Sequence, residues 1–231
     1  MYLKRCLSFL TRTVFPSHCM LCEGLLKYNE QSVCQVCMDS QPVCNRLHLT
    51  RLTPLVSNLR CTLNVALINA PSVSQLCYSL KYGSNPWLGQ RLGYNYIGPL
   101  IEIVANPSVV MIPMPVSRKR RRQRGYNQSV MLAKGCQKHL MSASIHVEIR
   151  AILEKCIHRK SQIHFDSFQR WTNAKGTFSV VEKKQHIPED ALLVLIDDTV
   201  TTGSTLIHAA EALRNSFPNN PLQLVALAIE L

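Results

Sequence analysis

Acidic residues are scarce in this chain of 231 residues. Its 14 Asp and Glu are outnumbered by 26 Lys and Arg, so the formal net charge is +12. Long apolar runs are also lacking: residues 191–196 form the longest obvious one, far below the roughly 18 residues that a membrane-spanning helix needs. The sequence therefore predicts a soluble protein without a membrane span, and its excess of positive charge indicates anionic partners.

Other scarcities exclude further classes of protein. The chain has nine Gly and twelve Pro without a repeating period, and 46% of its residues are hydrophobic. This composition excludes collagen-like and disordered chains. The apolar residues 6–10 are shorter than the core of a secretory signal, which has roughly 7 to 15 residues. We therefore expect a cytoplasmic protein with one good hydrophobic core and a small appendage.

Four of the ten cysteines form two Cys-x-x-Cys pairs that are separated by eleven residues. In a reducing compartment this spacing indicates a structural zinc site, because four thiolates complete a tetrahedral shell and leave no position for water. The candidate metal ligands are Cys19, Cys22, Cys34 and Cys37. A redox pair or four unrelated thiols are the alternatives, and Cys44 or His18 could replace one of the ligands.

Strand-sized apolar runs alternate with helical spacing along the rest of the chain. Such alternation predicts a parallel sheet flanked by helices. The predicted strands are residues 64–70, 108–115, 192–196 and 222–229, and the predicted helices are residues 73–80, 127–140 and 204–217.

The segment 192–206 gives the clearest functional signal. The apolar residues 192–196 lead into Asp197 and Asp198, and a loop of threonines with Gly203 then opens a helix. Ligands of parallel sheets bind at the carboxyl ends of the strands. We therefore expect a binding site at this loop.

The chemistry of the loop suits a ribose 5-phosphate unit. Gly203, the outward-pointing amides of a helix N-terminus and several hydroxyls can surround a phosphate. Asp197 and Asp198 can only accept hydrogen bonds when ionised, which suits two vicinal ribose hydroxyls. A plain helix cap would account for one of these polar residues and not for the others. A nucleotide P-loop is disfavoured because no Gly-x-x-x-x-Gly-Lys-Ser/Thr motif is present here.

The segment 194–206 resembles the phosphoribosyl-pyrophosphate (PRPP) signature of type I phosphoribosyltransferases. Further motifs are Leu-Lys-Tyr-Gly at 80–83, Pro-Met-Pro at 113–115, Arg-Gly-Tyr-Asn-Gln at 124–128 and a polar stretch at 162–178. Together with the cysteine pairs, these motifs resemble the ComF/GntX family, a phosphoribosyltransferase-like group linked to competence and to the use of external DNA. The resemblance covers about residues 15 to 231.

The resemblance implies a type I phosphoribosyltransferase fold at residues 59–231, after a zinc-ribbon region at residues 1–58. It implies a structural Zn²⁺ in the ribbon and an Mg²⁺ that accompanies PRPP. The residues implied to bind PRPP are Lys81, Tyr82, Gly83, Asp197, Asp198, Thr199, Val200, Thr201, Thr202, Gly203, Ser204 and Thr205. The residues implied to act in catalysis are Asp197, Asp198, Lys81 and Arg124. For Lys81, a solvated lysine at a helix end is the alternative.

Two basic or polar stretches remain. The run Arg118, Lys119, Arg120, Arg121 and Arg122 is a candidate contact for nucleic acid, and a solvated surface is the alternative. Residues 157–178 resemble the mobile hood that covers the sugar phosphate in this superfamily, and an ordinary surface connection is the alternative.

Three functions are therefore consistent with the sequence. The first is a phosphoribosyltransferase that salvages nucleobases from imported DNA. The second is a sensor that binds PRPP or a nucleotide without turnover. The third is a component of DNA uptake that contacts single-stranded DNA and other uptake proteins through the ribbon and the arginine run. The acceptor of the phosphoribosyl group is not indicated by any motif.

Overall fold

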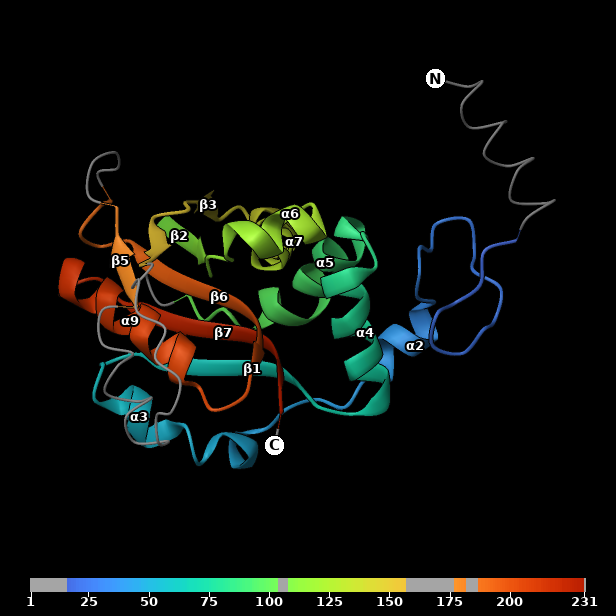
Figure 1. The fold of residues 1–231 in the computed structure, drawn as a ribbon, viewed down its shortest axis with the longest axis horizontal. Coiled ribbons are helices and arrows are strands. Elements are labelled where there is room, and N and C mark those ends of the chain that lie inside the picture. Colours follow the sequence, from blue (N-terminus) through green and yellow to red (C-terminus); the bar gives the residue numbers. More distant parts are fainter. Residues whose placement is uncertain (1–15, 104–107, 157–176, 182–186, 231) are drawn as a thin grey trace, which may run out of the picture.

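A computed structural model describes residues 16–103, 108–156, 177–181 and 187–230 of the chain. At its centre lies a five-stranded parallel sheet in the order β1-β7-β6-β2-β3 (Figure 1). Its strands are β1 Thr62–Ile68, β2 Ser108–Pro113, β3 His146–Ile149, β6 Leu192–Val200 and β7 Leu222–Ile229. A separate antiparallel pair is formed by β4 (Leu153–Lys155) and β5 (Phe178–Val180). The predicted α/β class with a parallel sheet is confirmed.

Helices cover both faces of the sheet. They are α2 Gln35–Asp39, α3 Thr53–Ser57, α4 Pro71–Tyr82, α5 Pro86–Leu92, α6 Arg118–Arg124, α7 Gln128–Ser142 and α9 Ser204–Ser216, with short turns η1 Arg46–Leu49, η2 Gly93–Ile97 and η3 Gly98–Leu100. Local signals explain where several begin. Pro71 occupies the first turn of α4, where a missing N–H costs nothing. The side chain of Asn127 caps α7 by accepting a hydrogen bond from the Ser129 backbone N–H at 3.0 Å.

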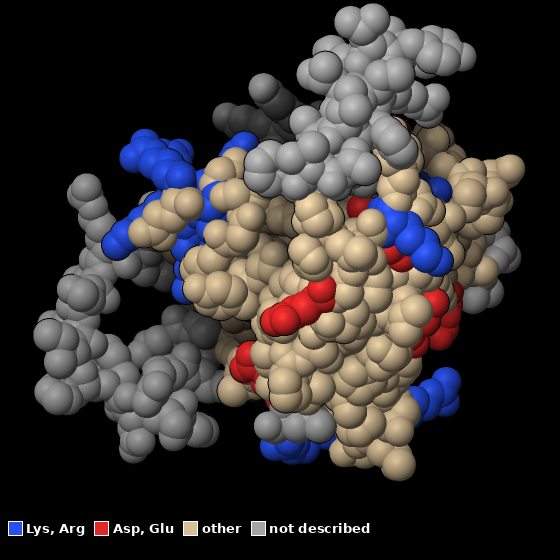
Figure 2. Space-filling view, turned by 90° about the vertical axis from the view of Figure 1, so that its right-hand side faces the viewer, with Lys and Arg blue, Asp and Glu red and all other residues tan. Residues whose placement is uncertain are grey.

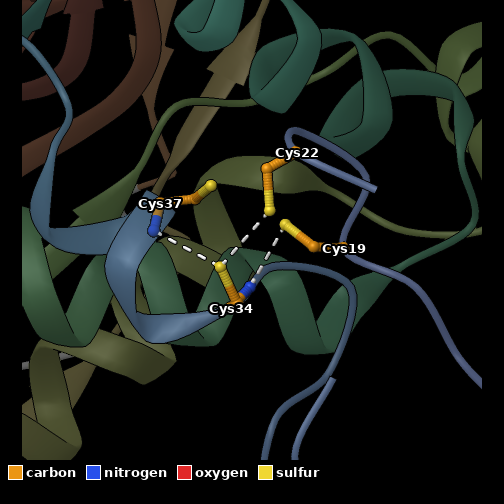
Figure 3. A group of neighbouring side chains, drawn as sticks. All are labelled: Cys19, Cys22, Cys34 and Cys37. Carbon is orange, nitrogen blue, oxygen red and sulfur yellow. Dashed lines mark hydrogen bonds between the residues drawn. The ribbon is translucent and has the colours of Figure 1, made fainter. Parts of the chain in front are cut away.

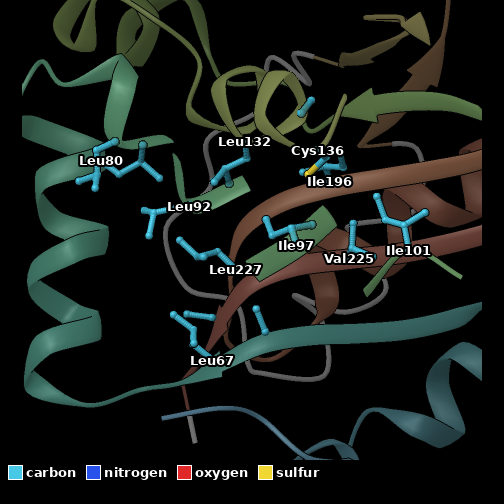
Figure 4. Close-up of a cluster of buried hydrophobic side chains, with 14 of the residues drawn as sticks. Leu67, Leu80, Leu92, Ile97, Ile101, Leu132, Cys136, Ile196, Val225 and Leu227 are labelled. Carbon is cyan, nitrogen blue, oxygen red and sulfur yellow. The ribbon is translucent and has the colours of Figure 1, made fainter. Parts of the chain in front are cut away.

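Two hydrophobic cores lie on opposite faces of the sheet. Successive side chains of a strand point to opposite faces, so the apolar run of β6 serves both cores. Val194 and Ile196 face the core beneath α4, α5 and α7, and Leu193 and Leu195 face the core beneath α3 and α9. Figure 4 shows the first of these cores, to which β1, β6 and β7 contribute from below and the helices from above. Burial on both faces fixes β6, and with it the position of the polar segment that follows.

The predicted strands and helices are present with shifted ends, and one shift matters for the site. The sequence predicts that the third strand ends at Ile196, but β6 continues through Asp197 and Asp198 to Val200. The reason is its neighbour: β7 runs alongside this extension and pairs with it, for example Thr199 with Ala228, whereas β2 stops pairing at Ile196. The two carboxylates therefore sit on a strand with one free edge and not on a loop.

The amino-terminal region packs firmly on the rest of the molecule (Figure 1). Arg91 of α5 donates hydrogen bonds to the Val33 and Gln31 carbonyl oxygens and, at 3.0 Å, to the Gln35 side chain. The Val33 side chain is completely buried in the core beneath α4 and α5. These contacts attach the cysteine-containing region to the helical face of the sheet.

Residues 42–57, which we call the strap, continue from this region along β1 to the other face of the sheet. Val43 forms an isolated bridge with Leu67 of β1. Leu52 and Val56 are then buried in the core beneath α9. The strap therefore links the two faces.

Among the described residues, no helix has both the length and the apolar character that crossing a bilayer requires.

Candidate functional site

A pocket of about 550 Å³ opens at the carboxyl ends of β2 and β6. Its size is typical of small-molecule sites. All the residues predicted to bind PRPP line it except Gly83, and all four predicted catalytic residues line it. The walls also include residues 114–117, Ser129, Lys155 and Glu230, which the sequence analysis did not assign to the site, and Phe178, the last residue of the predicted hood. Residues 157–176 of the predicted hood, which was predicted to cover residues 157–178, lie outside the described residues.

The turn between β6 and α9 depends on Gly203. This residue has a φ of 76°, in the left-handed region that favours glycine, and it precedes the first residue of α9. A Cβ atom at this position would lie 2.8 Å from Leu52 Cδ2, so the strap packs directly beneath the turn. The positive end of the 13-residue helix α9 is thereby directed at a turn with exposed Thr201 and Thr202. This geometry suits an anionic group.

Asp197 and Asp198 lie side by side at the floor of the pocket. Asp197 Oδ1 accepts a hydrogen bond from the Asp198 backbone N–H at 2.8 Å, and Ser129 Oγ lies 3.5 Å from the same oxygen. Removal from water, together with the neighbouring Asp198 carboxylate, raises the pKa of Asp197 far above its usual range. Both carboxyl groups thus line the cavity, where their oxygens can receive hydroxyl donors or a cation.

Lys81 already has partners among these groups. It lies in the last turn of α4, and its Nζ is 3.5 Å from Asp198 Oδ2 and 3.1 Å from Thr199 Oγ1. Gly83 ends α4 outside the pocket walls, and a Cβ there would lie 2.7 Å from the Ser79 carbonyl oxygen. Glycine at 83 is therefore required by close packing within the helix end. Lys81 brings a positive charge to the carboxylate side of the pocket.

A second positive group enters the pocket from α6. The Arg124 guanidinium lies over the Tyr82 ring, with Cζ 5.3 Å from the ring centroid, and its Nη1 donates to Gln128 Oε1 at 3.0 Å. Tyr126 secures this region by donating from its hydroxyl to the Leu80 carbonyl oxygen at 2.7 Å. The Arg-Gly-Tyr-Asn-Gln motif therefore joins α4, α6 and α7 at one wall. The structure thus places the predicted residue Arg124 on this wall, which follows β2, the neighbour of β6.

The rest of the predicted nucleic-acid run forms the exposed helix α6. Arg120 lines the pocket with Arg124, whereas Arg118, Lys119, Arg121 and Arg122 are exposed and do not line it. On the face seen in Figure 2, Lys and Arg side chains lie at the upper left and also at the right and lower edges, and acidic side chains lie in the middle and at the right. The basic helix thus adjoins the pocket and extends the positive charge beyond it.

The four predicted metal ligands come together in the amino-terminal region (Figure 3). Their sulfur atoms all lie within 4.8 Å of one another, and Cys22 Sγ is 3.8 Å from Cys34 Sγ. Zn–S bonds of about 2.3 Å in a tetrahedron place sulfurs about 3.8 Å apart. Backbone N–H groups also point at the sulfurs: Cys34 N is 3.3 Å from Cys19 Sγ, and Cys37 N is 3.4 Å from Cys34 Sγ. The cluster fits a structural metal such as zinc.

Electrostatics within the cluster favour thiolates unevenly. Burial opposes ionisation of Cys19, but the backbone N–H groups of Cys34, Cys22 and Leu21 outweigh it and lower the pKa of Cys19 to about 6. A bound cation would favour ionisation of all four sulfurs. Neither of the alternative ligands, His18 and Cys44, belongs to this group of neighbouring ligand atoms.

The chain is similar to two competence proteins. It is 31% identical to Competence protein F of Haemophilus influenzae over 104 residues, which make up 45% of the chain and 43% of that protein. It is 25% identical to Competence protein ComFC of Bacillus subtilis over 199 residues, which make up 84% of the chain and 77% of that protein. The match thus spans less than half of the first relative, and no family model matches the chain. The likeness to both proteins, together with the four-cysteine cluster, supports the resemblance to the ComF family.

Proposed function

We propose that the pocket binds PRPP and that the protein uses or senses it in the cytoplasm as part of competence. The observation that supports this most strongly is the convergence of an Asp pair, a helix N-terminus and two cationic side chains in one cavity of about 550 Å³. Each group matches a different part of one molecule. The names of the two relatives support a competence-related role.

The 5-phosphate would lie at the turn before α9, where the backbone amides of residues 201–205 and the Thr hydroxyls can donate to it. Asp197 and Asp198 would accept from the two ribose hydroxyls. Lys81 would move from Thr199 and Asp198 to the pyrophosphate. The reason is that a doubly charged anion attracts the Lys81 ammonium more strongly than the Thr199 hydroxyl attracts it. The ligand thereby replaces the contacts that Lys81 already makes with Thr199 and Asp198 in the pocket.

Transfer would proceed by displacement of pyrophosphate from C1 of the ribose. The C1–O bond to pyrophosphate breaks ahead of the formation of the new C–N bond to a nitrogen nucleophile, so positive charge develops on the sugar, and the nucleophile gives up its proton to solvent. Asp197 and Asp198 would place negative potential beside that charge, and Lys81 and Arg124 would stabilise the leaving pyrophosphate. Mg²⁺ bound together with PRPP would supply further neutralisation of the leaving group. The ribbon's role is structural, through zinc held by its four cysteines.

Calorimetric titration of PRPP with Mg²⁺ into the protein tests the proposal. We expect binding by wild type and a loss of at least tenfold in affinity for Asp198→Asn, because a hydrogen bond to a charged group contributes roughly 1.5–3 kcal/mol. Asp39→Asn is the matched control, since Asp39 ends α2 outside the pocket walls. Equal binding by both variants, or none by wild type, would refute the proposal. Pyrophosphate release with a panel of bases then separates a transferase from a sensor.

The exposed basic helix α6 favours a second candidate function, contact with single-stranded DNA during uptake. Phosphate contacts of this kind are general and depend steeply on salt. Replacement of the exposed cations Arg118, Lys119, Arg121 and Arg122 by Ala should abolish DNA binding while PRPP binding persists. Binding that does not change with salt, or with these replacements, would exclude the helix as the contact.

A further inference from the structure

Gln128 has a buried donor that no described residue satisfies. It is the first residue of α7, it lines the pocket, and only 1% of its surface is exposed. Its Oε1 accepts a hydrogen bond from Arg124 Nη1 at 3.0 Å, but its Nε2 has no hydrogen-bond partner among the described residues. A buried polar atom without a partner costs about 1–3 kcal/mol, and folded proteins contain few of them. The donor therefore calls for an acceptor from elsewhere.

The direction of this amide follows from its neighbour. A guanidinium group can only donate hydrogen bonds, so the oxygen of the Gln128 amide must face Arg124. The nitrogen is then left on the opposite side of the amide group and cannot be exchanged with the oxygen without losing the bond to Arg124. The unpaired donor is thus a consequence of the Arg124 contact.

The surroundings of Gln128 favour an anionic acceptor. The positive end of the 15-residue helix α7 lies here, and the backbone N–H of Ser129 is already satisfied by the Asn127 cap. Arg124 adds a full positive charge on the same wall, held between the Tyr82 ring and Gln128. This wall is formed by α6 and α7, whereas the turn before α9 forms a different wall of the pocket. The pocket therefore has helix N-termini from two different helices in its walls.

We propose that Gln128 is a ligand-binding residue that recognises, together with Arg124, a second anionic group of the molecule bound in the pocket. Its carbonyl oxygen positions Arg124, and its amide nitrogen donates to an oxygen of that group. The inference rests on the proposed function and adds a residue to it: Gln128 discriminates a ligand that carries a pyrophosphate, such as PRPP, from a simple sugar monophosphate.

Titration of inorganic pyrophosphate, PRPP and ribose 5-phosphate, each with Mg²⁺, into wild type and Gln128→Met tests this inference. Met has a similar length but neither a donor nor an acceptor of comparable strength. We expect pyrophosphate and PRPP to bind roughly 10- to 100-fold more weakly to the variant, as for the loss of one hydrogen bond to a charged group, and ribose 5-phosphate to bind as it does to wild type. Gln123→Met, an exposed change on α6, is the matched control.

The melting temperature without ligand gives an independent measurement. Because Nε2 has no partner among the described residues, Gln128→Glu, which keeps the oxygen that accepts from Arg124 and removes only the donor, should melt at the same temperature as wild type or higher, whereas a lower value would indicate a structural partner of Nε2 and overturn the inference. Gln128→Glu should keep the contact with Arg124 yet weaken pyrophosphate binding through charge repulsion. Unchanged pyrophosphate and PRPP binding by both variants would overturn the role of Gln128 and leave the proposed function intact. Failure of wild type to bind any of the three ligands would overturn both.

Discussion

Replacement of Gly203 by Ala should destabilise the protein through two effects that can be separated. The first is the backbone: a φ of 76° is in the left-handed region, where a residue with a Cβ costs roughly 1–2 kcal/mol. The second is contact: the new Cβ would lie 2.8 Å from Leu52 Cδ2, and overpacking of this kind costs roughly 1–3 kcal/mol. The expected loss in the free energy of unfolding is therefore about 2–5 kcal/mol.

Gly125→Ala isolates the backbone effect. Gly125 has a φ of 79°, but a Cβ there would meet nothing within 4 Å, so only the cost of roughly 1–2 kcal/mol applies. Urea unfolding followed by circular dichroism should place Gly203→Ala about 1–3 kcal/mol below Gly125→Ala, or roughly 2–12 °C lower in melting temperature.

Leu52→Ala removes the atom that the new methyl group would meet. In that background, Gly203→Ala should cost no more than Gly125→Ala, so the two changes at positions 52 and 203 should be coupled by about 1–3 kcal/mol. Additive effects of the two changes, or equal costs at positions 203 and 125, would refute the claim that the strap supports the turn before α9.

Three further predictions concern charge and metal. Burial raises the pKa of Asp197 to about 8 in the folded protein, above its unfolded value of about 4. Wild type should therefore lose stability relative to Asp197→Asn as the pH rises from about 4 to about 8. A difference in melting temperature between the two proteins that stays constant from pH 4 to pH 8 would contradict this prediction. Chelation of metal from the zinc-loaded protein, or Cys34→Ser, should lower the melting temperature and expose the ribbon to protease, whereas an unchanged digestion pattern would argue against a structural metal. If single-stranded DNA contacts α6, Arg121→Ala with Arg122→Ala should reduce the slope of log affinity against log salt by about 1.4, and an unchanged slope would exclude both residues.

The sequence predicted the parts of the molecule in which one physical signal dominates. Strand β6 is recognisable because a strand buried on both faces must be apolar throughout, and α9 because Gly203 and the threonines precede a periodic apolar pattern. The cysteine cluster follows from spacing alone, since two Cys-x-x-Cys pairs leave few other arrangements. The end of β6 was predicted four residues too early because it depends on how far β7 runs beside it, which is a property of the fold.

The walls of the pocket were harder to predict because they come from distant segments. Lys155 and Phe178 reach the pocket from a short antiparallel pair whose strands have three residues each, too short for a periodic signal. The helix α5 and the turn η2 were missed for a related reason. Gly89 and Gly93 weaken the helical signal there, yet Gly93 is needed because a Cβ would lie 2.1 Å from the Leu132 carbonyl oxygen of α7.

The strap has a consequence for how this chain can vary during evolution. Because Leu49, Leu52 and Val56 complete the core beneath α9, a fragment that starts at residue 59 would expose that core and lose the support of Gly203. The cysteine region before residue 42 could shrink, expand or change its metal ligands without touching that core. We therefore expect relatives to differ in their Cys-x-x-Cys pairs while retaining apolar side chains at these three positions. The strap then connects a variable cysteine region to a constant sheet domain.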